Sequence, residues 1–100
     1  ILDNNKIQSL GYVKDIIKLE PLKNKFESFG AKVFRCDGHN VNKIQNLLNL
    51  KVSKKPKIII ADTIKGKGIS FMENNNQWHY KNPNVKELKL ALQEIDKKYA

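Results

Sequence analysis

Cysteine, arginine and long apolar runs are all scarce in this sequence. Cysteine occurs once, as Cys36, which excludes an intrachain disulfide; its place in an apolar run predicts a small buried residue and a reducing compartment. No apolar run approaches the roughly 20 residues that span a bilayer, and the first residues lack the layout of a signal peptide. We therefore expect a cytoplasmic protein without a membrane segment.

Arginine occurs once, as Arg35, although the formal net charge is +9. The lysines alternate with apolar residues over 16–25 and 86–98, as they do on solvated helix faces. Recognition of base edges relies heavily on the fork of arginine, so we expect no nucleic-acid partner. The alternative is a non-catalytic basic α/β module, which would bind nucleic acid with a steep dependence on salt.

With 100 residues, the chain has room for one domain with a modest core and not for two. It begins at Ile1-Leu2-Asp3 without an initiator methionine. We expect residues 1–100 to be a portion of a single domain that belongs to a longer protein.

Apolar spacing and capping residues predict alternating strands and helices. Ile1-Leu2 is expected to end a strand, and Ala31–Cys36 and Ile58–Ala61 are compact apolar runs that predict two more. Helices are predicted where apolar residues recur on one face and where a proline or asparagine can begin a helix. Their apolar positions are Leu22, Phe26 and Phe29; then Val41, Ile44, Leu47 and Leu48 after Asn40; and Val85, Leu88, Leu92, Ile95 and Tyr99 after Asn84, which with Glu87 forms a capping box.

Such alternation favours the α/β class, with a parallel sheet and flanking helices. The three successive isoleucines at 58–60 suit a parallel strand that is covered on both faces. Ligands of open parallel sheets bind beyond the carboxyl ends of the strands. The segments after Leu2 and after Ala61 are therefore the places to look for a site.

Three segments carry candidate chemistry, and each has a simpler alternative. Asp3-Asn4-Asn5 offers hard oxygen donors suited to Mg²⁺, but asparagine-rich turns also bond their own backbone. The glycines of Lys65–Gly68 allow close approach to an anion, or mark a surface turn. His79, beside Trp78, suits proton transfer, or packing against an aromatic neighbour.

Taken in order, these segments resemble the transketolase family, and specifically the C-terminal part of the thiamine diphosphate-binding N-terminal subunit of split bacterial transketolases. The resemblance covers nearly the whole chain and rests on these stretches: Asp3–Gly11, Leu19–Leu22, Phe29-Gly30, Asp37–His39, Lys55-Pro56, Ile58–Ala61, Thr63–Asn75 and Trp78–Lys81.

The resemblance implies a role for five residues. Asn5 matches the asparagine that ends the family's cofactor signature, so its amide oxygen would ligate Mg²⁺ together with the carbonyl of Ile7. Ser9 and Lys65 would lie near the cofactor. His79 would contact the diphosphate and donor substrate and help move protons, and it is the implied catalytic residue. Tyr80 follows His79 where many members have glycine, which implies an altered sugar specificity.

The implied activity is transfer of a two-carbon ketol unit from a ketose or its phosphate to an aldose or its phosphate, with thiamine diphosphate and Mg²⁺. The implied partner is a C-terminal, pyrimidine-binding transketolase subunit, in a dimer or heterotetramer, because one N-terminal half is not a complete enzyme. The alternative within thiamine chemistry is another enzyme of the class, such as a deoxyxylulose-phosphate synthase or a component of a 2-oxo acid dehydrogenase.

Overall fold

The structure, a computed structural model, describes residues 1–100 apart from the side chain of Tyr99. The chain forms two compact units, each described by itself. The sheet unit comprises Ile1–Asn5 and Ile17–Thr63, and the hairpin unit comprises Lys6–Ile16 and Ile64–Ala100. The elements are β1 (Leu2–Asn4), β2 (Ile7–Gln8), β3 (Gly11–Tyr12), α1 (Val13–Ile16), α2 (Leu22–Ser28), β4 (Lys32–Asp37), α3 (Val41–Asn49), β5 (Lys57–Asp62), the 3₁₀ helix η1 (Asn76–His79) and α4 (Val85–Tyr99).

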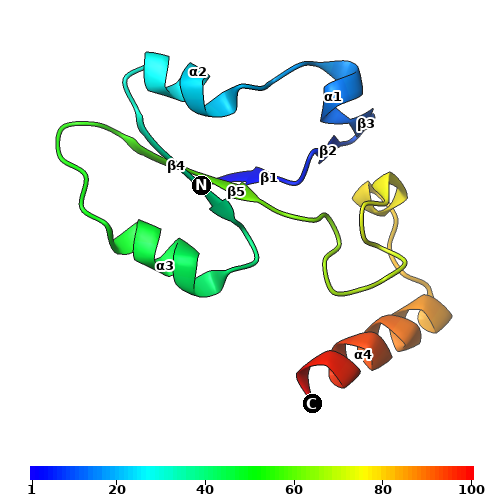
Figure 1. Ribbon diagram of the computed structural model, residues 1–100. Coiled ribbons are helices and arrows are strands. Elements are labelled where there is room, and N and C mark those ends of the chain that lie inside the picture. Colours follow the sequence, from blue (N-terminus) through cyan, green and yellow to red (C-terminus); the bar gives the residue numbers. More distant parts are fainter. The chain divides into compact units, whose positions relative to one another are not determined.

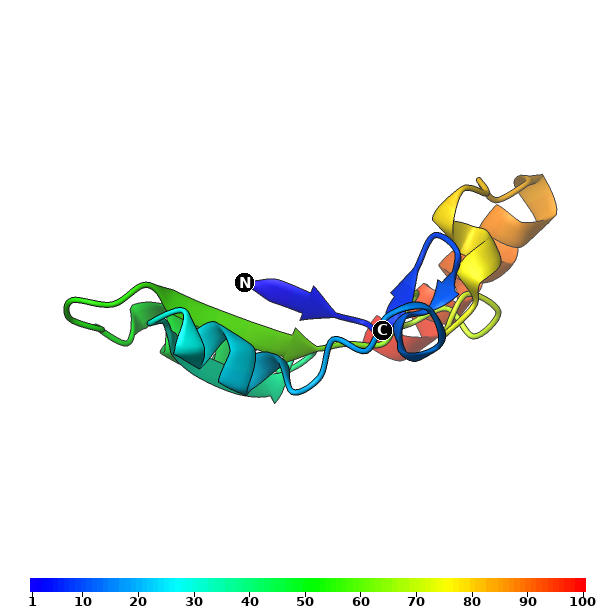
Figure 2. The same ribbon diagram turned by 90° about the horizontal axis from the view of Figure 1, so that it is seen from above.

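The sheet unit confirms the predicted α/β class. Its three strands are parallel in the order β1-β5-β4, and the arrowheads of β1 and β5 point the same way in Figure 2. Figure 1 shows α2 on one side of the sheet and α3 on the other. The first strand runs to Asn4, two residues beyond the predicted end, because Asp3 and Asn4 pair with Ala61 and Asp62 of β5.

The core of the sheet unit lies where α2 meets the sheet. Ile60 is fully buried at the centre of the middle strand. It forms a cluster with three other buried residues, Leu22, Ala31 and Val33. Three partly buried residues pack against this cluster: Leu2, Phe26 and Ile58. Cys36 is buried too, as predicted for a small apolar residue. Burial of the isoleucine run on both faces explains why its sequence shows no polar alternation.

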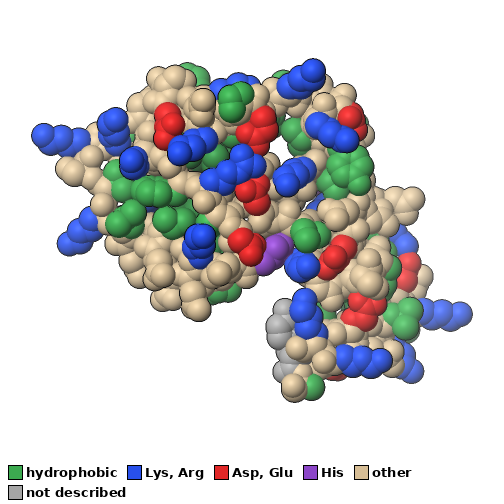
Figure 3. All heavy atoms as spheres, in the orientation of Figure 1, with side chains coloured by type: hydrophobic (Ala, Val, Ile, Leu, Met, Phe, Trp, Pro, Cys, Tyr) green, Lys and Arg blue, Asp and Glu red, His purple; other side chains and the backbone are tan. Residues whose placement is uncertain are grey.

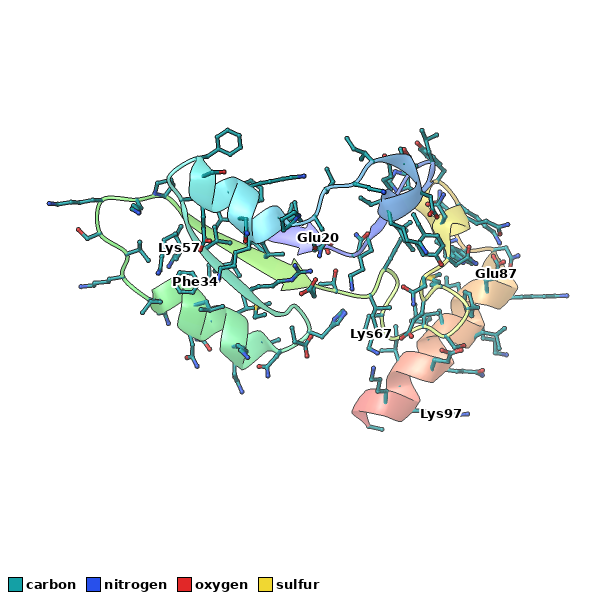
Figure 4. All side chains as sticks on the ribbon, turned by 45° about the horizontal axis from the view of Figure 1, so that its top comes forward. Glu20, Phe34, Lys57, Lys67, Glu87 and Lys97 are labelled. Carbon is teal, nitrogen blue, oxygen red and sulfur yellow. The ribbon has the colours of Figure 1, made fainter. Side chains whose placement is uncertain are left out.

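The two ends of α3 are both satisfied by side chains. The Asn40 Oδ1 atom accepts from the backbone N–H of Lys43 at 2.9 Å, which confirms the predicted cap. At the other end, Lys57 Nζ donates to three main-chain carbonyls, those of Leu47, Leu48 and Leu50, at 2.7–2.8 Å. A cation at a helix C-terminus also opposes the negative end of the helix dipole. Lys57 (labelled in Figure 4) thereby ties α3 to the first residue of β5.

Gly38 lies where the chain after β4 passes close to the end of β5. Its N–H donates to the carbonyl of Asp62 at 2.8 Å. A Cβ at this position would lie 2.4 Å from Thr63 Cγ2, 3.0 Å from Ala61 Cβ and 3.1 Å from the Asp62 carbonyl oxygen. Only glycine therefore fits here without displacement of β5 or of Thr63.

We expect Gly38→Ala to lower the free energy of unfolding by about 1–3 kcal/mol, as overpacking does. Thr63→Ser removes the methyl group that makes the closest contact and keeps the hydroxyl that donates to Asp3. The double variant should therefore recover part of the loss, with Thr63→Ser alone as the control. Urea denaturation measures all three, and a double variant no more stable than Gly38→Ala would contradict this steric account.

The hairpin unit contains the elements that the sequence pattern did not predict. The strands β2 and β3 pair antiparallel around Ser9 and Leu10, and Val13 N–H donates to the Lys6 carbonyl at 2.9 Å. Each strand has only two residues, and Gly11 adopts a φ of 140°, so neither propensity nor alternation signals them. The segment 69–83 contains the 3₁₀ turn η1.

The final helix begins at the predicted capping box but presents a different face inward. Asn84 accepts from Glu87 N–H, and Glu87 accepts from Asn84 N–H. Ala91 is buried, whereas the predicted apolar stripe is exposed at Val85, Leu88, Leu92 and Ile95. The side chain of Tyr99, the last member of that stripe, lies outside the described residues.

A second anchor fixes α4 within the hairpin unit. The carboxylate of Glu94 accepts from the Ser70 N–H at 2.6 Å and from the Ser70 hydroxyl at 2.7 Å. These two hydrogen bonds hold the pKa of Glu94 below its usual value. Since Glu94 lies one helical turn from Ala91, the pair explains why this face of α4 turns toward the loop.

On the face shown in Figure 3, hydrophobic side chains appear as separate areas among lysines, carboxylates and neutral side chains. Among the helices as described, none combines the length and apolar character that a bilayer crossing needs.

Candidate functional site

The carboxyl ends of β1 and β5 form a hydrogen-bonded cluster in the sheet unit. Side chains alternate along a strand, so Asp3 and Asn4 point to opposite faces of the sheet. Asn4 Nδ2 donates to Asp62 Oδ1 at 2.7 Å, and the Thr63 hydroxyl donates to Asp3 Oδ1. Each face of the sheet therefore contributes one bond that fixes the end of β1.

Asn5 follows directly and is half-buried. Its amide nitrogen lies 3.5 Å from Asp3 Oδ2, to which it donates. The amide oxygen of Asn5, and not its nitrogen, is the atom that could bind a hard cation. An amide oxygen is the kind of hard donor that Mg²⁺ takes.

Within residues 1–100 as described, no group of three or more His, Cys, Asp or Glu side chains could hold a metal ion. Asn5 offers one amide oxygen to a cation. Mg²⁺ commonly keeps such a sparse protein shell and binds phosphate oxygens as well.

Arg35 completes the cluster from β4. Its Nε and Nη2 atoms donate to the two carboxylate oxygens of Asp62 at 2.7 Å and 2.9 Å, and its Nη1 lies 2.9 Å from Glu20 Oε1. Its hydrogen bond with Asp62 raises the pKa of Arg35. The pKa of Glu20 is lowered, first by the Leu22 N–H that its other oxygen accepts and then by Arg35. Arg35 is therefore a charged link between β4, β5 and the start of α2.

Ile7 and Ser9 lie in the hairpin unit, where the hairpin is fastened to η1. Asn76 Nδ2 donates to the Ser9 carbonyl at 3.0 Å. The Asn76 Oδ1 atom is buried and has no hydrogen-bond partner among the described residues. The hydrogen bond links Ser9 to the same short helix that carries His79.

Lys65 opens a loop that is closed by its own bonds. Its carbonyl accepts from the Asn74 N–H at 2.9 Å. Gly66 has a φ of 74°, and a Cβ there would lie 2.4 Å from the Met72 carbonyl oxygen. The Gly68 N–H donates to Glu73, whose pKa this bond lowers, and Lys67 Nζ lies 3.7 Å from the same carboxylate. The loop therefore already holds one carboxylate.

His79 is exposed at the end of η1, between Trp78 and Tyr80. Trp78 Nε1 donates to the Phe71 carbonyl at 3.1 Å, and Lys81 Nζ lies 4.4 Å from the Trp78 ring centre. The imidazole meets the Tyr80 ring edge-on, with ring centres 4.6 Å apart. Tyr80 is itself 80% exposed, so this contact leaves the imidazole accessible to solvent.

The predicted site residues are thus distributed over both units. Asn5 belongs to the sheet unit, whereas Ile7, Ser9, Lys65 and His79 belong to the hairpin unit.

Sequence reasoning missed the links made by Glu20, Arg35 and Asp62. Sequence carries no signal for these links, because Arg35 faces Asp62 through the register of β4 on β5, and Glu20 lies in the segment before α2.

Comparison with known proteins finds a matching family and several similar proteins. Residues 1–98 match the family described as "Transketolase, thiamine diphosphate binding domain". One subunit of an apulose-4-phosphate transketolase from Actinobacillus succinogenes is 42% identical over 96 residues, 95% of this chain and 35% of that protein. The 6-deoxy-6-sulfo-D-fructose transketolase subunit SqwG from Clostridium sp. (strain MSTE9) is 38% identical over 100 residues, 98% of this chain and 36% of that protein.

A human transketolase is 30% identical over 81 residues, which make up 81% of this chain and 13% of that protein. The chain spans about a third of the length of the two bacterial relatives.

Proposed function

Because this chain belongs to the thiamine diphosphate-binding domain family of transketolases, we propose that it forms part of a transketolase assembled from subunits. The enzyme would transfer a two-carbon ketol unit from a ketose or its phosphate to an aldose or its phosphate. The observation that carries this proposal is Asn5, which follows the parallel strand β1 directly and donates from its amide nitrogen to Asp3.

The cofactor, when bound, supplies the stabilised carbanion chemistry that breaks and forms the carbon–carbon bonds. The residues of this chain would bind and orient it. The Asn5 amide oxygen and the Ile7 carbonyl would hold Mg²⁺, which in turn anchors a diphosphate. Ser9 and Lys65 would line the same cofactor, and the Lys65 ammonium group would offset its negative charge.

His79 would donate hydrogen bonds to the diphosphate and the donor sugar and would exchange protons with the sugar hydroxyls. Its exposure at the end of η1 supports this role, since a proton-transfer group must reach its substrate. Tyr80, in edge contact with the imidazole, would limit the space beside it and add a hydroxyl group. We propose that Tyr80 narrows the range of sugars accepted.

A second polypeptide would supply what this chain does not. The two bacterial relatives are both named as subunits of a transketolase, which supports a partner that carries the pyrimidine-binding domain. The assembly would be a dimer or heterotetramer that acts on sugars or sugar phosphates in the cytoplasm.

The test is reconstitution of the protein with its partner subunit. We expect thiamine diphosphate to bind only with Mg²⁺, by calorimetry, and ketol transfer to appear when a ketose and an aldose are both supplied. Cofactor binding without ketol transfer, but with release of CO₂ from pyruvate, would assign another thiamine enzyme. An absence of Mg²⁺-dependent cofactor binding would overturn the proposal altogether.

A further inference from the structure

Asp62 receives three side-chain hydrogen bonds at the end of β5. Two come from the Arg35 fork, at 2.7 Å and 2.9 Å, and one comes from Asn4 Nδ2 at 2.7 Å. A bidentate pair between guanidinium and carboxylate fixes the carboxylate plane as well as its position. Once that plane is fixed, the direction in which Asn4 must point is fixed too.

Strand register places these groups on one face of the sheet. Leu2 pairs with Ile60, Asn4 with Asp62 and Arg35 with Ile60, so these side chains share the face that α2 covers. Asp3 pairs with Ala61 and points to the opposite face, where it accepts from Thr63. The end of β1 is thus held from both faces immediately before Asn5.

Loss of the Arg35–Asp62 pair would change the surroundings of Asn4. Arg35 and Asp62 are each about one third exposed, at 35% and 31%, so water competes for them only in part. Without Arg35, the Asp62 carboxylate would lose the two hydrogen bonds that fix its plane, and water would have to replace them. The Asn4 side chain would then donate to a carboxylate that has several orientations instead of one.

We propose that Arg35 and Asp62 are positioning residues for the cation ligand Asn5. The inference rests on the proposed function, and it deepens it by assigning residues that touch neither cation nor cofactor. Residues that orient metal ligands typically change metal affinity by about 10–100-fold when they are removed. The Arg35–Glu20 pair leads instead to the start of α2, so it supplies a matched control on the same guanidinium.

The test measures the Mg²⁺ concentration that half-saturates thiamine diphosphate binding in the assembled enzyme, by calorimetry, together with the melting temperature without Mg²⁺. We expect Arg35→Met to raise that concentration about tenfold or more. Arg35→Lys, which keeps the charge and loses the fork, should give a smaller rise. Glu20→Gln should lower the melting temperature without a change in the Mg²⁺ requirement.

Two results would overturn the inference: an Arg35→Met enzyme with the parent's Mg²⁺ requirement, or equal rises in Arg35→Met and Glu20→Gln. If Arg35→Met fails to fold, the isosteric Asp62→Asn breaks the same ion pair and is judged by the same criterion. Asn5→Ala separates this inference from the function it rests on. An Mg²⁺ requirement that responds to Asn5→Ala but not to Arg35→Met removes the positioning role alone, whereas no response to Asn5→Ala removes the cation site itself.

Discussion

Replacement of His79 by alanine is expected to lower kcat of the assembled enzyme by about 10²- to 10⁴-fold, the usual contribution of a general acid or base. The imidazole is exposed and has one described aromatic contact, with Tyr80, so its loss opens no hole in the core. Affinity for thiamine diphosphate should change much less than turnover. Such a split between binding and turnover marks an interaction made during the reaction.

His39 provides the matched control, because it is also an exposed histidine and lies in the other unit. We expect His39→Ala to retain kcat, measured by a coupled assay of ketol transfer. Added imidazole should restore part of the activity of His79→Ala. If His79→Ala turns over like the parent enzyme, the imidazole serves only to pack against Tyr80.

The sheet unit could be predicted from sequence because local and tertiary signals agree there. Asn40 caps α3 as the sequence indicates, and the isoleucine run becomes the central strand. Each of these elements has a start signal, a hydrophobic pattern of the right period and a sufficient length. Agreement among such signals is what makes a segment predictable.

The hairpin unit was predictable only at its final helix, and there only in part. The strands β2 and β3 exist because Gly11 and the Lys6–Val13 bond close the chain on itself, and a two-residue strand has no period to detect. On α4, the apolar stripe and the capping box predicted the helix but not its inward face. That face is set by Ala91 and by the bond from Ser70 to Glu94, a contact 24 residues apart in sequence.

The candidate site shows the same limit. Asn5 and His79 could be proposed from a resemblance, because single residues at fixed places carry it. The bonds that orient Asn5 depend on register between β1, β4 and β5, which sequence alone does not specify. Arg35 is the one arginine of the sequence, and in the structure it links β4 to Asp62 and Glu20.

Replacement of Asn5 by alanine is expected to raise the Mg²⁺ concentration needed for thiamine diphosphate binding by about 100-fold, at the upper end of the effect of a lost orienting residue. The variant loses the amide oxygen and retains Asp3, whose carboxylate stays engaged by Thr63. Asn42, an exposed asparagine in α3, gives the control: Asn42→Ala should leave the requirement unchanged.

Asn5→Asp separates the oxygen ligand from the amide that carries it. A carboxylate restores a hard oxygen donor, but it cannot donate to Asp3 and adds a like charge beside it. We therefore expect Asn5→Asp to bind Mg²⁺ better than Asn5→Ala and to melt at a lower temperature than the parent without the metal. Equal Mg²⁺ requirements in the two variants, measured by calorimetric titration, would mean that the oxygen at this position ligates nothing and that Asn5 serves only to close the turn after β1.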